Sequence, residues 1–166
     1  MKLAGKFTVI FDCIIDFMAI FAGILLMLVL IGVTVGVAVR YFLGISMFYV
    51  VEISAYSLLY ICFLVAPWVL KKEGHVMLDL VVNHLDERIN SLIGIITSIA
   101  AAIVFSIIAW YGTKATWELF QSGYFVPSIL APPKYIIVGI IPFSCLLLTI
   151  QFIRRAWDFA RNRNTT

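Results

Sequence analysis

Charged residues are scarce in this chain, and their scarcity excludes an ordinary soluble protein. Asp, Glu, Lys and Arg make up 13% of the 166 residues, whereas 63% are hydrophobic and the mean hydropathy is +1.08. Soluble chains carry roughly 45–50% apolar and about 25% charged residues on average. A single soluble core could not bury this much apolar surface. The composition therefore predicts an integral membrane protein surrounded by a lipid bilayer.

Residues that could hold a metal ion or haem are also few. The two histidines, His75 and His84, lie nine positions apart in a polar segment. The three cysteines, Cys13, Cys62 and Cys145, form no CxxC or similar metal-binding spacing. We therefore predict no metal site and no cofactor, and expect the thiols to be buried and to pack as small hydrophobic groups.

Patterns typical of enzymes and of nucleic-acid-binding proteins are missing as well. The sequence has no HExxH, no GxSxG and no glycine-rich phosphate loop. The net charge of +3 is not accompanied by a basic groove or a base-stacking platform. We predict that the protein is not an enzyme, has no catalytic residues and does not bind nucleic acid.

Four long stretches contain no charged residue, and each is long enough to cross a bilayer. They cover residues 17–39, 53–70, 89–113 and 135–153. A helix needs about 20 residues, at ~1.5 Å each, to cross ~30 Å of hydrocarbon. Because the runs are continuously apolar rather than alternating, they favour helices over barrel strands. The sequence predicts an all-α membrane protein, with residues 1–166 forming one domain of four transmembrane helices.

A polar segment at residues 71–88 separates the two hydrophobic halves. It holds seven of the 21 formally charged residues and both histidines. Apolar residues at helical spacing between 77 and 85 predict a short amphipathic helix on the membrane surface, and residues 6–16 predict a similar lead-in to the first span. Nine Lys and Arg residues lie on the side of both termini and this segment, against three on the other side. The excess predicts that both termini are cytoplasmic.

Small residues within the spans mark faces where helices could approach closely. Gly32 and Gly36 form a GxxxG pattern, which indicates close packing or arises by chance, because glycine is common in membrane helices. The third span carries a stripe of small residues four positions apart, which we expect to face another helix or subunit: Gly94, Ser98, Ala102 and Ser106.

Charged and aromatic residues gather at the outer membrane boundary, opposite the termini. Arg40 and Tyr41 close the first span and Glu52 opens the second, so Arg40 and Glu52 could pair across the hairpin, contact a partner, or form an ordinary surface salt bridge. The connection over residues 114–134, on the same outer side, is longer than a turn requires. It either docks a second protein or lies on the membrane interface, and its candidate docking residues are Trp117, Tyr124, Phe125 and Pro127.

A self-sufficient transporter is disfavoured by the lack of charge at the centre of the spans. Ion-coupled carriers need a polar site near the bilayer midplane. Here every charged residue lies at or beyond the end of a predicted span. The remaining alternatives are a subunit of a larger carrier and a stand-alone structural or assembly protein with no part in transport.

Several short patterns, in this order, resemble one family. They are Arg40-Tyr41 ending the first span, Glu52 opening the second, Gly74-His75-Val76-x-x-Asp79 after it, and Pro133-Lys134-Tyr135 with Pro142 near the fourth. Over residues 11–155 the chain resembles the small membrane subunit of tripartite ATP-independent periplasmic (TRAP) transporters, the DctQ family.

The resemblance implies a role in secondary transport. Such subunits pair, in the bacterial inner membrane, with a large multispan permease that takes up substrate with sodium by an elevator motion. A periplasmic substrate-binding protein delivers organic anions such as carboxylates or sialic acids. The small subunit is then a scaffold that anchors the permease. On this resemblance Arg40 and Glu52 order the outer hairpin and the subunit contact, while Gly74, His75 and Asp79 form the turn and start of the inner amphipathic helix.

Overall fold

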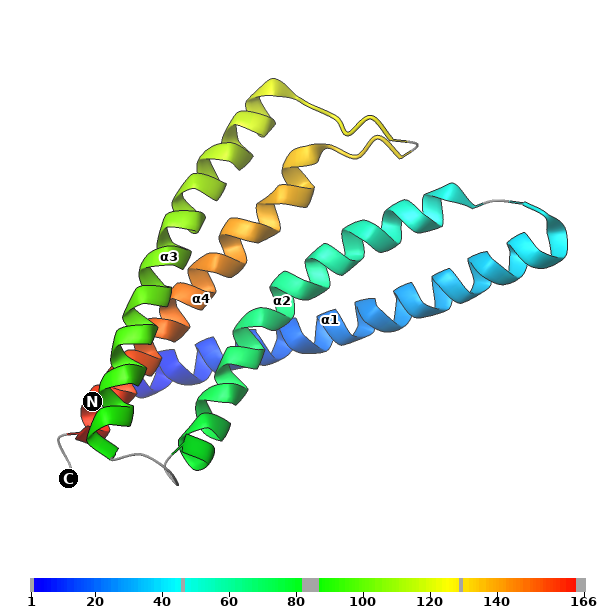
Figure 1. Cartoon of the computed structure of the whole chain (residues 1–166). Coiled ribbons are helices and arrows are strands. Elements are labelled where there is room, and N and C mark those ends of the chain that lie inside the picture. Colours follow the sequence, from blue (N-terminus) through cyan, green and yellow to red (C-terminus); the bar gives the residue numbers. More distant parts are fainter. Residues whose placement is uncertain (1, 46, 82–86, 129, 164–166) are drawn as a thin grey trace.

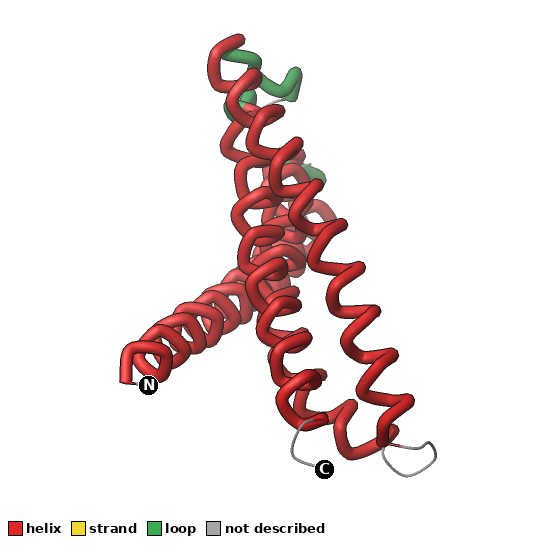
Figure 2. Tube along the Cα trace, turned by 90° about the vertical axis from the view of Figure 1, so that its left-hand side faces the viewer, coloured by secondary structure: helices red, strands yellow, loops and turns green. Residues whose placement is uncertain are grey.

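The computed structural model describes the chain except for residues 1, 46, 82–86, 129 and 164–166, and describes side chains for residues 9–45, 47–72, 92–128 and 130–160. It consists of four helices: α1 (Lys2–Leu43), α2 (Phe48–Val81), α3 (Glu87–Ser122) and α4 (Lys134–Arg163). Figure 2 shows helices joined by short connections. Each predicted span lies within one helix. All four helices contain a stretch long and apolar enough to cross a membrane, which confirms the predicted fold class.

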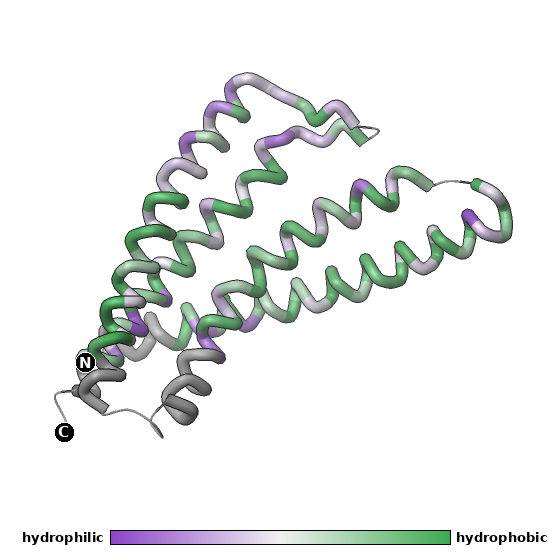
Figure 3. Tube along the Cα trace, in the orientation of Figure 1, coloured by the Kyte–Doolittle hydropathy of each residue, from purple (hydrophilic) through white to green (hydrophobic). Residues whose placement is uncertain are grey.

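The four helices form two hairpins that meet through one helix of each. Helices α1 and α2 pack along one another, as do α3 and α4, and α2 also packs on α4. The two hairpins diverge toward the end that carries the α1–α2 and α3–α4 connections, which we call the loop end (Figure 1). Both chain termini lie at the other end, the terminal end. In Figure 3 the helices between the two ends are predominantly hydrophobic.

All four helices extend beyond the predicted spans, and in three of them this corrects the expectation of a separate surface segment or connection. Residues 6–16 are part of the unbroken helix α1, and residues 71–81 continue α2 rather than starting a new helix. Residues 114–122, predicted to belong to the periplasmic connection, form the last turns of α3. None of these three segments contains a proline, and a single glycine costs a helix only about 1 kcal/mol. Leaving the apolar region is therefore not enough to end a helix.

Two glycines end helices at the loop end. Gly44 follows α1 with φ of 68°, and its amide donates to the carbonyl of Arg40 at 3.1 Å. Gly123 follows α3 with φ of 59°. Glycine adopts this left-handed conformation without the steric cost that other residues incur, which is why it commonly terminates helices.

The core of the molecule lies toward the terminal end, where three helices meet. Met18 and Ala22 of α1 and Leu64 of α2 form its centre, and partly buried Tyr60, Ile140 and Leu147 pack against it, together with Ile61 and Val65. Along α1 the buried residues Phe11, Ile15, Met18 and Ala22 are spaced by four, three and four residues. This spacing places them on one face of the helix, as in left-handed helix packing.

Candidate functional site

At the terminal end, one ion pair joins α1 to α2 and another joins α1 to α4. The Asp12 carboxylate accepts from the Arg154 guanidinium of α4 at 2.8 Å, and the Asp16 carboxylate accepts from the Lys71 ammonium of α2 at 2.8 Å. Lys71 also donates to the backbone carbonyl of Asp12 at 3.3 Å. The Arg154 guanidinium lies over the Phe11 ring, 5.4 Å from its centroid. One end of α1 is therefore held by both α2 and α4.

Sequence reasoning did not identify these four residues as a group. The signal was available, because the predicted topology places two aspartates and two basic residues at the same membrane face. Opposite charges at the ends of neighbouring spans tend to pair, since an unpaired charge near hydrocarbon is costly. What the sequence lacked was the pairing itself, which depends on how the helices lie against each other.

Most hydroxyl groups within the spans donate to backbone carbonyls. Six of them, those of Thr34, Ser54, Thr97, Thr113, Thr116 and Thr149, bond to the carbonyl four residues earlier in their own helix, at 2.7–2.8 Å. This local bonding is typical of Ser and Thr in membrane helices. These hydroxyl groups are therefore satisfied within their own helices and are not directed toward a solute.

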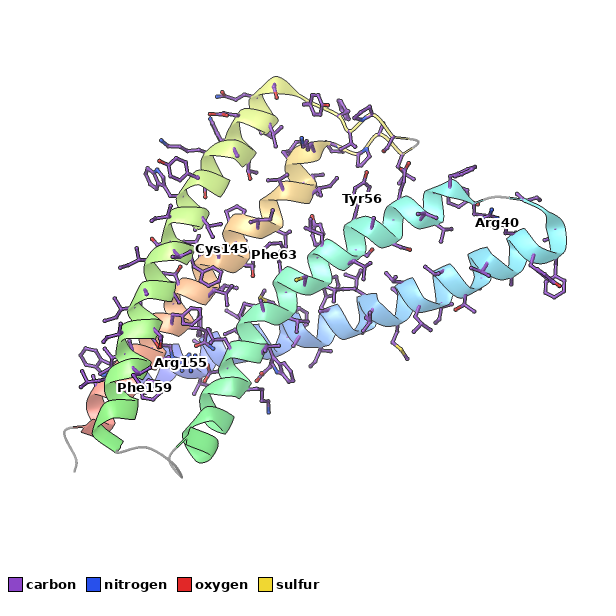
Figure 4. All side chains as sticks on the ribbon, in the orientation of Figure 1. Arg40, Tyr56, Phe63, Cys145, Arg155 and Phe159 are labelled. Atoms are coloured by element: carbon purple, nitrogen blue, oxygen red, sulfur yellow. The ribbon has the colours of Figure 1, made fainter. Side chains whose placement is uncertain are left out.

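Two further hydroxyl groups connect α2 with α4. Tyr60 of α2 donates to the carbonyl of Ile136 at 2.6 Å, and Ser144 of α4 donates to the carbonyl of Phe63. Figure 4 places Phe63 and Cys145 in the region where α2 and α4 approach each other. Cys145 is buried here, whereas Cys13 and Cys62 are exposed, so the expectation that the thiols are buried holds for one of the three.

Glu52 anchors the α3–α4 connection at the loop end. Its carboxylate accepts from the backbone amide of Leu130 at 3.2 Å. Two backbone hydrogen bonds close this connection into a narrow loop. The amide of Lys134 donates to the carbonyl of Tyr124, and that of Val126 to the carbonyl of Pro132, both at 3.1 Å. Glu52 thus connects α2 with the loop of the other hairpin, while its predicted role in ordering the α1–α2 hairpin and the subunit contact stays a prediction.

The other residues predicted at the periplasmic side are mostly exposed. Arg40 is exposed on the outer part of α1 (Figure 4). Tyr41 is 83% exposed and contacts the ring of Phe42 edge to face, with centroids 5.3 Å apart. The proposed docking residues Trp117, Tyr124, Phe125 and Pro127 are exposed too. Trp117 belongs to α3 rather than to the loop, so these four residues form a band around the end of α3 and the loop.

The small residues of α3 pack against α4, with one exception. A Cβ added at Gly94 would lie 2.9 Å from the Phe159 ring, and Ser98 and Ala102 are buried. Ser106 is exposed. Beyond Ala102 the α3–α4 contact continues through Phe105, which stacks on Phe152 with centroids 5.6 Å apart. It then passes through Ala109 and through Gly112, which faces Pro142.

The GxxxG pattern of α1 faces α2 within the same hairpin. A Cβ added at Gly36 would lie 3.5 Å from Val50, and one at Gly32 4.0 Å from the same side chain. Both distances are ordinary van der Waals contacts. The pattern therefore supports contact inside this chain.

The inner motif of Gly74, His75 and Asp79 falls within α2, and its side chains lie outside the described residues. Because the helix runs without a break through these positions to Val81, Gly74 is not a turn and Asp79 does not begin a helix. This corrects both expectations, for the same reason as above: one glycine does not stop a helix with regular residues on both sides.

Among the described residues, no group of three or more His, Cys, Asp or Glu side chains gathers at one place.

Comparison with known proteins identifies the family. No curated protein and no solved structure matches the chain. The family model for "Tripartite ATP-independent periplasmic transporters, DctQ component" matches residues 29–162, which is most of the chain. The protein therefore belongs to the DctQ family, the small membrane components of TRAP transporters.

Proposed function

We propose that this protein is the fixed scaffold of a sodium-driven TRAP transporter that takes up organic anions such as carboxylates or sialic acids. It anchors a large elevator-type permease in the bacterial inner membrane. Its terminal end and both termini face the cytoplasm, and its loop end faces the periplasm. The excess of Lys and Arg on the side of the termini supports this orientation.

One observation carries the proposal: among the described residues, most polar groups within the spans contact the chain's own helices. Charged residues lie toward the ends of the helices, and two of the described pairs connect α1 with α2 and α4. Most described hydroxyl groups in the spans donate to backbone carbonyls of the same or a neighbouring helix. A carrier needs polar groups directed at its solute or coupling ion. This arrangement suits a part that stays in place while its partner moves.

The broad apolar surface of α1 is the proposed contact for the permease. Outside its buried stripe, α1 exposes large side chains on several faces, including Phe17, Ile24 and Leu28. Its charge-free stretch, residues 17–39, has 23 residues, or roughly 35 Å at ~1.5 Å per residue, which exceeds ~30 Å of hydrocarbon. Such a helix must tilt in the bilayer or have its surplus length covered by protein. A neighbouring membrane subunit supplies that cover, and Arg40 and Tyr41 lie at its outer edge.

The exposed aromatic band at the loop end is the proposed contact for the periplasmic binding protein. Trp117 lies 6.0 Å from Phe120, and Phe120 lies 5.2 Å from Tyr135, measured between ring centroids. The loop beside them presents Tyr124 and Phe125. Aromatic side chains on a rigid support are typical anchors of protein interfaces. This contact is transient, because the binding protein must leave after delivering its substrate.

The test is reconstitution of the protein with a candidate large permease. We expect the two to elute as one complex, and uptake driven by a sodium gradient to require both subunits and the binding protein. Uptake by the permease without this chain would refute the scaffold role. Accumulation of a solute by vesicles that contain only this chain would refute the claim that it handles no cargo.

A further inference from the structure

Pro67 leaves one backbone carbonyl of α2 without its helical partner. Proline has no amide hydrogen, so the carbonyl four residues earlier, that of Phe63, loses the donor it would have in a regular helix. Pro67 does not end α2, which continues to Val81. In hydrocarbon no water is available to replace the missing donor, so the carbonyl must find one within the protein.

The missing donor comes from the other hairpin. The hydroxyl of Ser144 on α4 donates to the Phe63 carbonyl. Ser144 and Pro67 are both fully buried, at less than 2% exposure, so the bond is shielded from lipid and water. The two residues are far apart in sequence but lie where α2 and α4 pack together.

We propose that Ser144 is a positioning residue that replaces the amide lost at Pro67, and that this bond fixes the first hairpin against the second. The proline makes the carbonyl available, and the serine uses it to hold α4 at one register against α2. The bond therefore makes the contribution of Ser144 on α4 to stability depend on Pro67 on α2. This proposal concerns the chain itself and holds whichever permease the chain meets.

A second contact between the same helices provides a comparison. Tyr60 of α2 donates to the carbonyl of Ile136, whose helical donor, the amide of Ile140, is present because Ile140 is not a proline. The Tyr60 bond adds to a carbonyl that already has a partner. The Ser144 bond supplies the partner itself. Only the effect of removing Ser144 should therefore depend on residue 67.

The test is a double-mutant cycle on the full-length chain in lipid bicelles, unfolded with sodium dodecyl sulfate. With Pro67 present, Ser144→Ala should lower the ratio of folded to unfolded protein about three- to twentyfold, in the range measured for hydrogen bonds between membrane helices. With Pro67→Ala, which restores the amide, Ser144→Ala should change the ratio less than about twofold. An equal loss in both backgrounds would overturn the proposal.

Two control variants separate this role from general packing. Tyr60→Phe removes the other α2–α4 bond, and its effect should be the same in the native background as in the Pro67→Ala background. Ser98→Ala removes a buried hydroxyl that has no hydrogen-bond partner among the described residues, so it should leave the ratio nearly unchanged. Dependence of either control on residue 67 would mean that Pro67→Ala disturbs the whole interface, and would also overturn the proposal.

A direct measurement reads the bond even if Pro67→Ala fails to fold. Labelling Phe with carbonyl ¹³C and Leu with ¹⁵N selects two peptide groups, Phe42–Leu43 and Phe63–Leu64, because these are the only Phe-Leu pairs in the sequence. In solid-state NMR, Ser144→Ala should shift the Phe63 carbonyl resonance and leave that of Phe42 in place. An unchanged Phe63 resonance would show that Ser144 does not donate to it.

Discussion

The two hairpins of this protein differ in how completely each packs within itself. Helices α3 and α4 are in contact from Gly94 and Phe159 at one end to Gly112 and Pro142 toward the other. Helices α1 and α2 form their buried core near the terminal end, around Met18 and Leu64, and further along they meet where Gly36 faces Val50. Beyond the buried core α1 exposes most of its apolar side chains.

This difference indicates different tasks for the two hairpins. Without a hydrophobic force between helices in lipid, close packing decides which helices associate. The α3–α4 pair achieves that packing by itself, so it can serve as the stable part of the proposed scaffold. The α1–α2 pair leaves a long apolar surface that a second membrane protein can cover. Substitutions in the contact between α3 and α4, here called the α3–α4 seam, should therefore destabilise the chain. Substitutions on the exposed surface of α1 should act mainly on assembly with another membrane protein.

The largest effect on stability is expected from placing a side chain at Gly94, where α3 lies close to Phe159 of α4. In Gly94→Leu the new side chain would collide with the Phe159 ring, because even its Cβ would lie 2.9 Å from that ring. Overpacking of this kind typically costs ~1–3 kcal/mol of the free energy of unfolding. Unfolding of the full chain in detergent or bicelles measures it. Gly23→Leu is the matched control, because a Cβ at Gly23 meets nothing within 4 Å and both variants share the same gain in helix propensity. Equal stability of the two variants would contradict close packing of α3 and α4 at Gly94.

A smaller effect is expected from the ion pair between α1 and α4. Asp12→Asn should lower the free energy of unfolding by about 1–2 kcal/mol, between the values for exposed and buried pairs, since both side chains are about one-third exposed. Arg154→Gln should cost a similar amount, and the double variant less than the sum of both. Asp158→Asn, an exposed acidic residue on the same helix, is the control. Strict additivity of Asp12→Asn and Arg154→Gln would show that the pair contributes nothing.

The contact between α1 and α2 should tolerate a larger side chain better than the α3–α4 seam does. Gly36→Leu places its Cβ in ordinary contact with Val50, at 3.5 Å. We expect a loss of less than about 1 kcal/mol in unfolding, well below that of Gly94→Leu. If the two variants were equally destabilised, the difference between the hairpins would not be real. Co-purification with the permease, measured in parallel, should respond more to large polar substitutions on the exposed α1 surface than to either glycine variant.

The number and approximate position of the helices could be predicted from the sequence, and their lengths could not. Span prediction detects the part of a helix that lies in hydrocarbon, so residues 17–39 were found within a helix that covers Lys2–Leu43. Outside the hydrocarbon, polar residues continue a helix as readily as apolar ones. The actual ends depend on local signals, such as the positive φ of Gly44 and Gly123.

The small-residue stripe of α3 illustrates where spacing alone misleads. Successive steps of four residues rotate by about 40° around a helix, so three steps from Gly94 to Ser106 amount to ~120°. The stripe therefore leaves the α4 contact, and Ser106 is exposed while Phe105 and Ala109 continue the seam. Mixed steps of three and four residues would have predicted this face correctly.

Contacts between distant helices could not be predicted, because they depend on the register in which the helices pack. Pro67 and Ser144 stand 77 positions apart in the sequence. Nothing in either helix indicates that the Ser144 hydroxyl lies opposite the Phe63 carbonyl. The same holds for Asp12 with Arg154, whose charges were visible and whose pairing was not.

The smallest effect on global stability, and the most local one, is expected at Glu52. Its carboxylate holds the amide of Leu130, at the loop of the better-packed hairpin, so Glu52→Ala should release that loop without unfolding either hairpin. Hydrogen exchange of the Leu130 amide should accelerate about tenfold, as expected for the loss of a bond worth ~1.4 kcal/mol, while exchange in the α3–α4 seam stays unchanged. Glu118→Ala, an exposed glutamate on α3, is the control. If exchange accelerated along both hairpins alike, Glu52 would hold the whole bundle together, and the division of labour between a self-sufficient α3–α4 pair and a more open α1–α2 pair would be wrong.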